Sequence, residues 1–136
     1  MKIAPATAAD RAAVVALWQT AGLTRPWNDP AADYDLALAN PTSVVLLASD
    51  GAELAGSVMA GFDGHRGWVY YLAADPDRRK GGIGRALMQA AEQWLRDLGC
   101  PRVRLMVRAD NLAARGFYQA IGYADQDVVT LGRTLD

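Results

Sequence analysis

A glycine-rich loop with four cations, residues 75–87, constrains this chain more than any other segment. The loop reads DPDRRKGGIGRAL, and it lies between an apolar, β-prone run (68–74) and an amphipathic helical pattern (84–98). Glycines let a backbone turn tightly and bring its N–H groups close to a ligand. A helix that begins there adds unpaired N–H donors and the positive end of its dipole. The loop therefore predicts a site that holds a phosphate group.

Composition limits the kind of protein that carries this loop. The chain has 136 residues, of which 51% are hydrophobic and 21% charged, and this predicts one soluble domain spanning residues 1–136. A formal net charge of −1 argues against a nucleic-acid partner, which requires a basic face. The longest apolar runs, 12–18 and 68–74, are shorter than the ~20 residues that cross a bilayer. The single cysteine, Cys100, is interpreted as structural and fits a reducing compartment. We expect a cytoplasmic protein with no membrane partner.

Local patterns predict an alternating α/β order. Strands are expected at 2–4, 43–49, 53–62, 68–74, 102–108 and 128–135, and helices at 7–22, 29–39, 84–98 and 111–121. Because strand, loop, helix and strand follow one another over 68–108, that unit predicts a parallel strand pair with a right-handed crossover. The fold class is therefore a layered α/β structure.

Two familiar phosphate loops do not match. A P-loop ends in Gly-Lys-Ser/Thr, whereas Gly84 is followed by Arg85 and Ala86. A dinucleotide-binding loop needs a third glycine where this chain has Leu87, and an acidic residue that 102–108 lacks.

The remaining pattern resembles the acyl-CoA-binding signature of the GNAT N-acetyltransferase superfamily. Its parts are Arg79-x-x-Gly82-x-Gly84, then Asn111, Tyr118 and Gly122-Tyr123. The segments RPWNDP and DGHRG also resemble a bacterial subgroup whose substrates are poorly defined. The resemblance implies a single-domain, mixed and mainly antiparallel sheet with helices on both faces. Its central parallel strand pair would be splayed by a β-bulge near Leu72-Ala73.

The same resemblance implies acetyl-CoA as the cofactor. Its pyrophosphate would lie on backbone N–H groups of 79–85, and an N–H of 72–74 would polarise the acetyl carbonyl. The expected cofactor-binding residues are Leu72, Ala73, Ala74, Arg79, Lys80, Gly81, Gly82, Ile83, Gly84, Arg85 and Asn111. Tyr118 would act as the catalytic general acid toward the departing thiolate.

The acceptor is less defined by sequence. We expect a primary amine (a small molecule, a protein N-terminus or a lysine) that attacks directly in a ternary complex. Trp27, Asn28 and Asp29 are the candidate substrate-binding residues, and Trp27 could equally pack under the first two helices. The general base stays open among Asp29, Asp33 and Glu53. His65 lies in a glycine-flanked turn, and no metal site is expected.

Three alternatives accompany this interpretation. Strand 68–74 lacks the carboxylate that many relatives use as a base, which leaves open an acyl-CoA-binding sensor without turnover. Nucleotide phosphate binding unrelated to acyl transfer is a minor rival. A homodimer formed through edge strands is also compatible with the sequence.

Overall fold

The computed structural model describes residues 1–78 and 81–136, and the side chains of Arg79 and Lys80 lie outside the described residues. The chain forms two compact units, Met1–Met106 and Val107–Asp136. Each unit is described by itself below, and the single domain expected over 1–136 stays a prediction.

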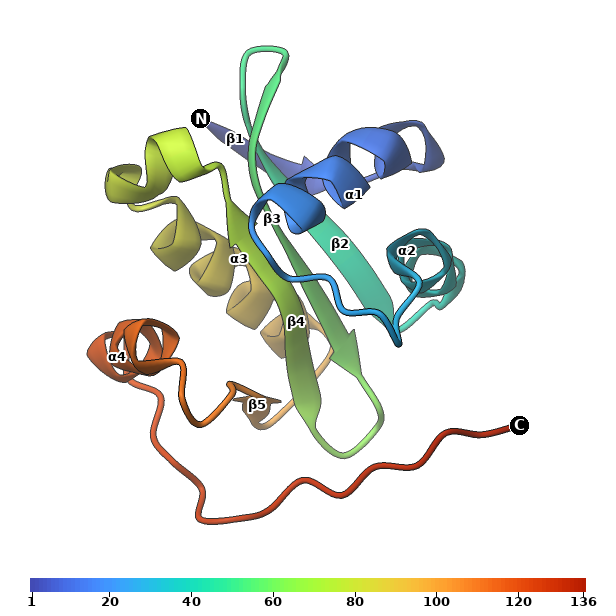
Figure 1. The fold of residues 1–136 in the computed structure, drawn as a ribbon, viewed down its shortest axis with the longest axis vertical. Coiled ribbons are helices and arrows are strands. Elements are labelled where there is room, and N and C mark those ends of the chain that lie inside the picture. Colours follow the sequence, from blue (N-terminus) through green and yellow to red (C-terminus); the bar gives the residue numbers. More distant parts are fainter. The chain divides into compact units, whose positions relative to one another are not determined.

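The first unit is built on a five-stranded sheet in the order β1-β2-β3-β4-β5 (Figure 1). Its strands are β1 (Lys2–Pro5), β2 (Ser43–Asp50), β3 (Glu53–Phe62), β4 (Gly67–Ala74) and β5 (Val103–Leu105). Neighbours are antiparallel except β4 and β5, which are parallel. The mixed sheet and its parallel pair are therefore confirmed. The pair lies at one end of the described sheet, with β5 as the last strand, and not at its centre.

Helices begin where the sequence supplies a cap. A short 3-10 turn, η1 (Ala8–Asp10), leads into α1 (Arg11–Thr20), and the Thr7 N–H donates to the Asp10 carboxylate at 2.8 Å. Helix α2 (Pro30–Ala39) begins after Asp29, whose carboxylate accepts from the Ala32 N–H at 3.1 Å. A second 3-10 turn, η2 (Pro76–Gly81), precedes α3 (Ile83–Asp97).

Helices cover both faces of this sheet. Helices α1 and α2 lie together on one side and α3 on the other (Figure 1). On the first side the buried cluster joins helix residues to alternate strand residues: Val14, Leu17, Trp18, Tyr34, Ala37, Val45, Leu47 and Ala73. Leu46 and Ala48 are also buried and point the opposite way, toward the face that α3 contacts. The core therefore has two layers, one on each side of the sheet.

A β-bulge interrupts β4. Met59 pairs with Tyr70, and Ser57 pairs with Ala73, so Val58 faces two residues, Tyr71 and Leu72. Tyr71 has a φ of 52°, in the left-handed region that non-glycine residues rarely adopt. The pairing of β4 with β5 ends at Val69 and Leu105, before the bulge. The expected bulge is confirmed, and the splay of the parallel pair stays a prediction.

The second unit contains one helix, α4 (Leu112–Ala120), whose N-cap Asn111 accepts from the Ala114 N–H at 3.1 Å. The strand predicted at 128–135 is wrong, because residues 124–136 have no regular secondary structure. Val129 and Leu131 there are 87% and 90% exposed. Alternating apolar residues form a strand only when a neighbouring strand supplies hydrogen bonds. The strand predicted at 102–108 is also too long, since β5 has three residues.

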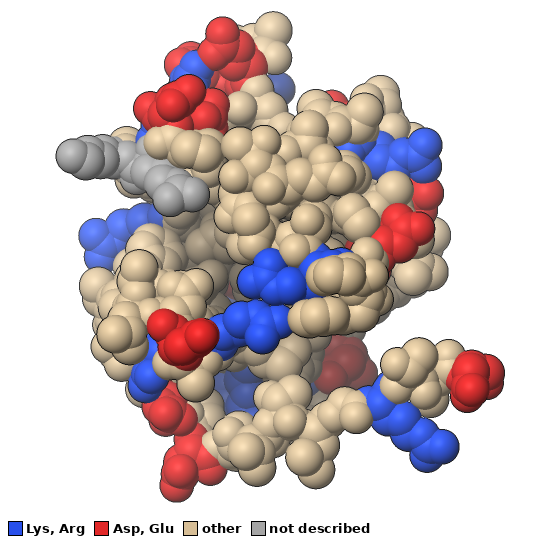
Figure 2. Space-filling view, in the orientation of Figure 1, with Lys and Arg blue, Asp and Glu red and all other residues tan. Residues whose placement is uncertain are grey.

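Charge is mixed on the face of the molecule in Figure 2, where lysine and arginine side chains lie among aspartates and glutamates. This agrees with the near-neutral formal charge of −1. Among the helices of the described residues, none is long and apolar enough to cross a bilayer.

Candidate functional site

The glycine loop leads into the N-terminus of α3, as the sequence predicts. Asp75 accepts from the Asp77 N–H at 3.0 Å and starts η2. Gly82 then takes a φ of 73° and is the N-cap of α3. The intrahelical bonds begin with the Ala86 N–H donating to the Gly82 carbonyl at 3.0 Å. The N–H groups of the preceding residues, 83–85, have no intrahelical acceptor, which is the usual arrangement of an anion site at a helix N-terminus.

The side chains around this loop differ in what they can offer a ligand. Ile83 is 2% exposed and belongs to the core, so it can contribute only its backbone. Gly81 is exposed, and an added Cβ there would meet nothing closer than Ile83 at 4.0 Å. Arg85 is exposed and available to a ligand. The expected contacts of Arg79 and Lys80 fall outside the described residues.

Arg78 is engaged elsewhere. Its guanidinium forms ion pairs with Asp50 at 2.9 Å, with Glu53 and with Asp75 at 3.9 Å. The hydrogen bond to Asp50 is the largest cause that raises the pKa of Arg78. These contacts tie the β2–β3 turn to the glycine loop. They also engage Glu53, one of the three candidate bases, in an ion pair at this turn.

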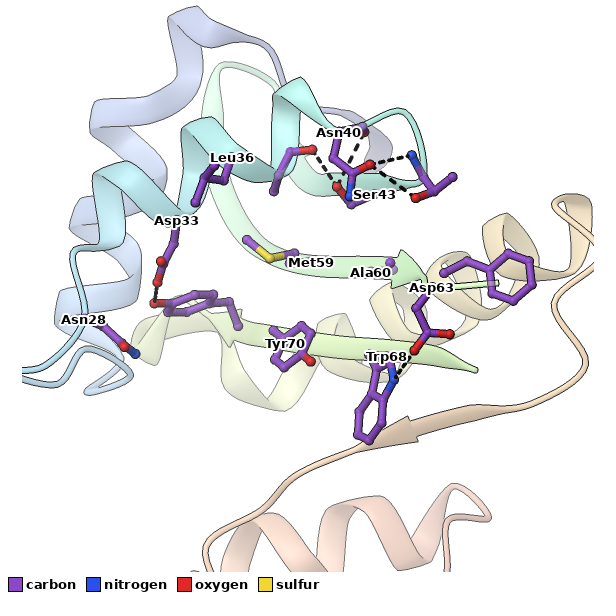
Figure 3. Close-up of a pocket in the computed structure, with 15 residues that line it drawn as sticks. Asn28, Asp33, Leu36, Asn40, Ser43, Met59, Ala60, Asp63, Trp68 and Tyr70 are labelled. Atoms are coloured by element: carbon purple, nitrogen blue, oxygen red, sulfur yellow. Dashed lines mark hydrogen bonds between the residues drawn. The ribbon is translucent and has the colours of Figure 1, made fainter. Parts of the chain in front are cut away.

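A cavity of about 640 Å³ lies between α2 and the strands β3 and β4 (Figure 3). This volume is within the usual range of small-molecule sites. Leu36, Met59 and Tyr70 supply apolar lining, and Asn28, Asp33, Asn40, Ser43 and Asp63 supply polar lining. Asp33 and Asp63 lie on opposite sides of the view, with Met59 and Tyr70 between them (Figure 3).

Asp33 and Tyr71 form the first end of the cavity. The Tyr71 hydroxyl donates to Asp33 Oδ2 at 2.7 Å, and the Asn28 side chain also hydrogen-bonds to Tyr71. Burial, followed by the bond to Asp33, raises the pKa of Tyr71 well above its usual value. The hydroxyl therefore stays a donor, and Asp33 keeps capacity to accept further hydrogen bonds.

The Tyr71 ring is held from behind by the core. It stacks on Trp18 with ring centroids 3.8 Å apart and planes 9° apart. Trp18 Nε1 donates to Ser57 Oγ at 2.9 Å, and that hydroxyl donates to the Tyr71 carbonyl at 3.5 Å. Ser57 is completely buried. These contacts stabilise the residue with positive φ, whose strain alone costs on the order of 1–3 kcal/mol.

Asp63 and Trp68 form the other end. The Asp63 carboxylate accepts from the N–H groups of Arg66 at 2.7 Å and His65 at 2.8 Å, and from Trp68 Nε1 at 3.3 Å. The bonds from Arg66 and His65 lower the pKa of Asp63, so it is ionised at neutral pH. His65 itself is exposed. Among the described residues, no group of three or more His, Cys, Asp or Glu could hold a metal ion.

The structure separates the predicted acceptor residues. Asn28 lines the cavity, whereas the Asp29 carboxylate caps α2. Trp27 is 70% exposed and is not among the lining residues, so it does not pack under the first two helices. Of the candidate bases, Asp33 lies in the cavity. The sequence interpretation did not identify Tyr71 as a site residue. The only available signal was the pair Tyr70-Tyr71, because two adjacent large polar aromatics do not fit the inward–outward alternation of a strand.

The second unit carries the other two predicted residues. Tyr118, on α4, packs edge-on against Phe117 and Tyr123, with ring centroids 5.1 Å and 5.8 Å away. Burial raises the pKa of Tyr118 to about 12. Asn111 uses its side-chain oxygen to cap α4. Their roles toward a ligand stay predictions.

Comparisons with known proteins agree with this geometry. A family model described as acetyltransferase (GNAT) family matches residues 12–123. An acetyltransferase of Pectobacterium atrosepticum is 45% identical over 126 residues, which cover 93% of this chain and 89% of the relative. A solved aminoglycoside N-acetyltransferase in complex with a CoA bisubstrate analogue superposes with a TM-score of 0.84 at 16% identity, covering 99% and 98% of the two chains. An acetyltransferase of Clostridium acetobutylicum with acetyl-CoA gives 0.80 at 15% identity, covering 96% and 95%. At these identities the two structures show a shared fold.

Proposed function

The chain belongs to the GNAT acetyltransferase family, and on that premise we propose that it transfers an acetyl group from acetyl-CoA to a primary amine. The observation that carries the proposal is the position of β4. This strand borders the 640 Å³ cavity through Trp68, Tyr70 and Tyr71, and it leads at its C-terminal end into the glycine loop. One strand thus connects a site suited to a phosphate-bearing donor with a site suited to an amine.

The donor side fits acetyl-CoA. The free N–H groups at the start of α3 would bind the pyrophosphate, and the open space at Gly81 allows its close approach. Ala73 and Ala74 pair with β3 on one side, but β5 pairing has already ended at Val69. Their other edge can therefore hydrogen-bond to pantetheine as an added strand would. An N–H of this stretch would donate to the acetyl carbonyl. Acetyl-CoA supplies the electrophilic thioester.

The acceptor side fits a cationic amine. Asp33 would attract the ammonium group and accept a proton as the neutral amine forms, while Tyr71 and Asn28 hold Asp33 and the cavity wall in place. The neutral amine nitrogen then bonds to the acetyl carbon, the carbon–sulfur bond breaks, the nitrogen releases its extra proton to solvent, and the thiolate takes up one proton. Tyr118 is the candidate donor of that proton, because its hydroxyl stays protonated up to a pH of about 12.

A substitution at Gly81, with a matched control, tests the donor site. The purified chain is incubated with acetyl-CoA and a panel of primary amines, and release of free thiol is followed. We expect Gly81→Val to weaken acetyl-CoA binding at least about tenfold, because a side chain there blocks the approach of the pyrophosphate. Gly132→Val, which also adds a side chain at an open glycine without positive φ, is the matched control and should bind normally.

Tyr118→Phe distinguishes an enzyme from a sensor. We expect it to lower amine-dependent thiol release while acetyl-CoA affinity is retained. Acetyl-CoA binding by the wild type without thiol release for any amine would favour the sensor. Binding of ATP in place of acetyl-CoA would contradict the donor assignment.

A further inference from the structure

Resting on the proposed function, we infer that the acceptor is a dication, with a reacting amine near Asp33 and a second cationic group between Asp63 and the rings of Trp68 and Tyr70. The first support is the size of the cavity. At about 640 Å³ it is far larger than a single small amine needs. The cavity therefore has room for a substrate that extends away from Asp33.

The second support is the chemistry of the far end. Asp63 is ionised, and among the described residues its Oδ1 accepts both backbone bonds whereas Oδ2 accepts the long 3.3 Å bond from Trp68. The Trp68 indole and the Tyr70 phenol line the same cavity, and Tyr70 is 42% exposed. A carboxylate beside two aromatic rings is suited to a cation, because each ring face attracts positive charge. A neutral or anionic group would gain nothing comparable there.

The third support is the lining between the two ends. Met59 of β3 and Leu36 of α2 supply apolar surface between the two ends, and Asp33 and Asp63 are the charged residues of the described lining (Figure 3). Asp33 bonds to Tyr71 and Asp63 bonds to Trp68, and these partners are three residues apart on β4. At ~3.3 Å per residue, the backbones of these two partners are on the order of 10 Å apart along the strand, so the two carboxylates are held at separate places in the cavity. The predicted substrate class is therefore an amine with an apolar spacer and a second cation.

The test uses the full chain with saturating acetyl-CoA. The kcat/KM for straight-chain α,ω-diamines is compared with that for n-alkyl monoamines of equal carbon number, by thiol release. We expect diamines to be preferred by about tenfold, with the largest preference at one spacer length, because the two carboxylates have fixed positions. Asp63→Asn keeps an oxygen for the bonds from His65 and Arg66 but removes the charge. This variant should reduce the preference for diamines to the factor that a diamine gains from having two amino groups instead of one.

A matched variant distinguishes the loss of the Asp63 contact from a general loss of negative charge. Asp35→Asn removes one exposed carboxylate of α2 that is paired with Arg11 and lies outside the cavity lining, and it should retain the preference. Tyr70→Leu keeps an apolar surface and should lower the preference in part.

Equal use of diamines and monoamines by the wild type, with amines still acetylated, would overturn the dication assignment alone. A preference that survives Asp63→Asn would overturn the assigned position. If neither series releases thiol, the proposed function fails and the inference fails with it.

Discussion

Gly56 is the position where one methyl group most directly tests the packing of α3 on the sheet. A Cβ added at Gly56 would lie 2.7 Å from Ile83 Cγ2, 2.9 Å from Leu87 Cδ1 and 2.9 Å from the Ala73 carbonyl oxygen. Ile83 and Leu87 are fully buried core residues, and the Ala73 oxygen is backbone of β4. The Ala73 oxygen cannot move without displacing β4, and the buried Ile83 and Leu87 side chains have little room to change rotamer.

Gly56→Ala is therefore expected to destabilise the fold by about 1–3 kcal/mol, the usual cost of overpacking a core. With an unfolding entropy of roughly 2.1 cal/mol/K per residue, 136 residues lose about 3–4 °C in melting temperature for each kcal/mol. The expected fall in Tm is thus roughly 3–11 °C. Because Ile83 begins α3, the displacement should also weaken acetyl-CoA binding.

Urea unfolding followed by circular dichroism measures the change in stability. Gly61→Ala on the same strand is the control, because its added Cβ would meet Ser43 Cβ at 3.5 Å and the Thr42 oxygen at 3.7 Å, which are ordinary contacts. An unchanged midpoint for Gly56→Ala, or equal losses in the two variants, would refute the argument that α3 packs directly against the glycine.

Two further predictions concern tyrosines. Tyr71→Phe keeps the stack on Trp18 but removes the donor to Asp33, so kcat/KM for the amine should fall about tenfold with acetyl-CoA affinity retained; a parallel loss of that affinity would assign the hydroxyl to the bulge instead. Burial raises the pKa of Tyr34 and of Tyr118 to about 12, whereas an unfolded tyrosine titrates near 10. Their contribution to stability is therefore complete below pH 10 and is lost as pH rises to about 12, by at most ~1.4 kcal/mol per pH unit for each residue. Urea unfolding between pH 8 and 12 should show this fall, and a smaller one in Tyr34→Phe; a flat profile would contradict it.

Local signals made much of the first unit predictable. Asp29 with Pro30 marks the start of α2, and the expected strand 53–62 is confirmed with the same bounds. Cap, proline and turn chemistry act within a few residues, so the sequence states them directly. The tail is different. Val128–Leu135 alternates as a strand does, but strand formation depends on a partner that is not encoded in the segment itself.

The turn at the proposed donor site was predictable from the sequence, whereas the lining of the cavity was predictable only in part. Gly82 adopts the positive φ that glycine permits, which is why a motif in the sequence marks the turn. Tyr71 adopts a positive φ that its residue type disfavours, so no propensity could indicate it. Asp63 joins the cavity because the β3–β4 turn folds back on Trp68, a contact set by strand register.

The bulge in β4 has two consequences that follow from one extra residue. Side chains alternate along a strand, so Trp68 and Tyr70 share a face and Tyr71 would normally point to the other. With Leu72 and Tyr71 together opposite Val58, Tyr71 turns to the same face as Tyr70 and reaches Asp33. The same change of direction comes directly after the last pair with β5, at Val69, and leaves the edge of 72–74 for the proposed donor. Removing the extra residue would therefore weaken the binding of both acetyl-CoA and the amine. Substitution of Asp33 should weaken only the amine site, and substitution of Gly81 only the acetyl-CoA site.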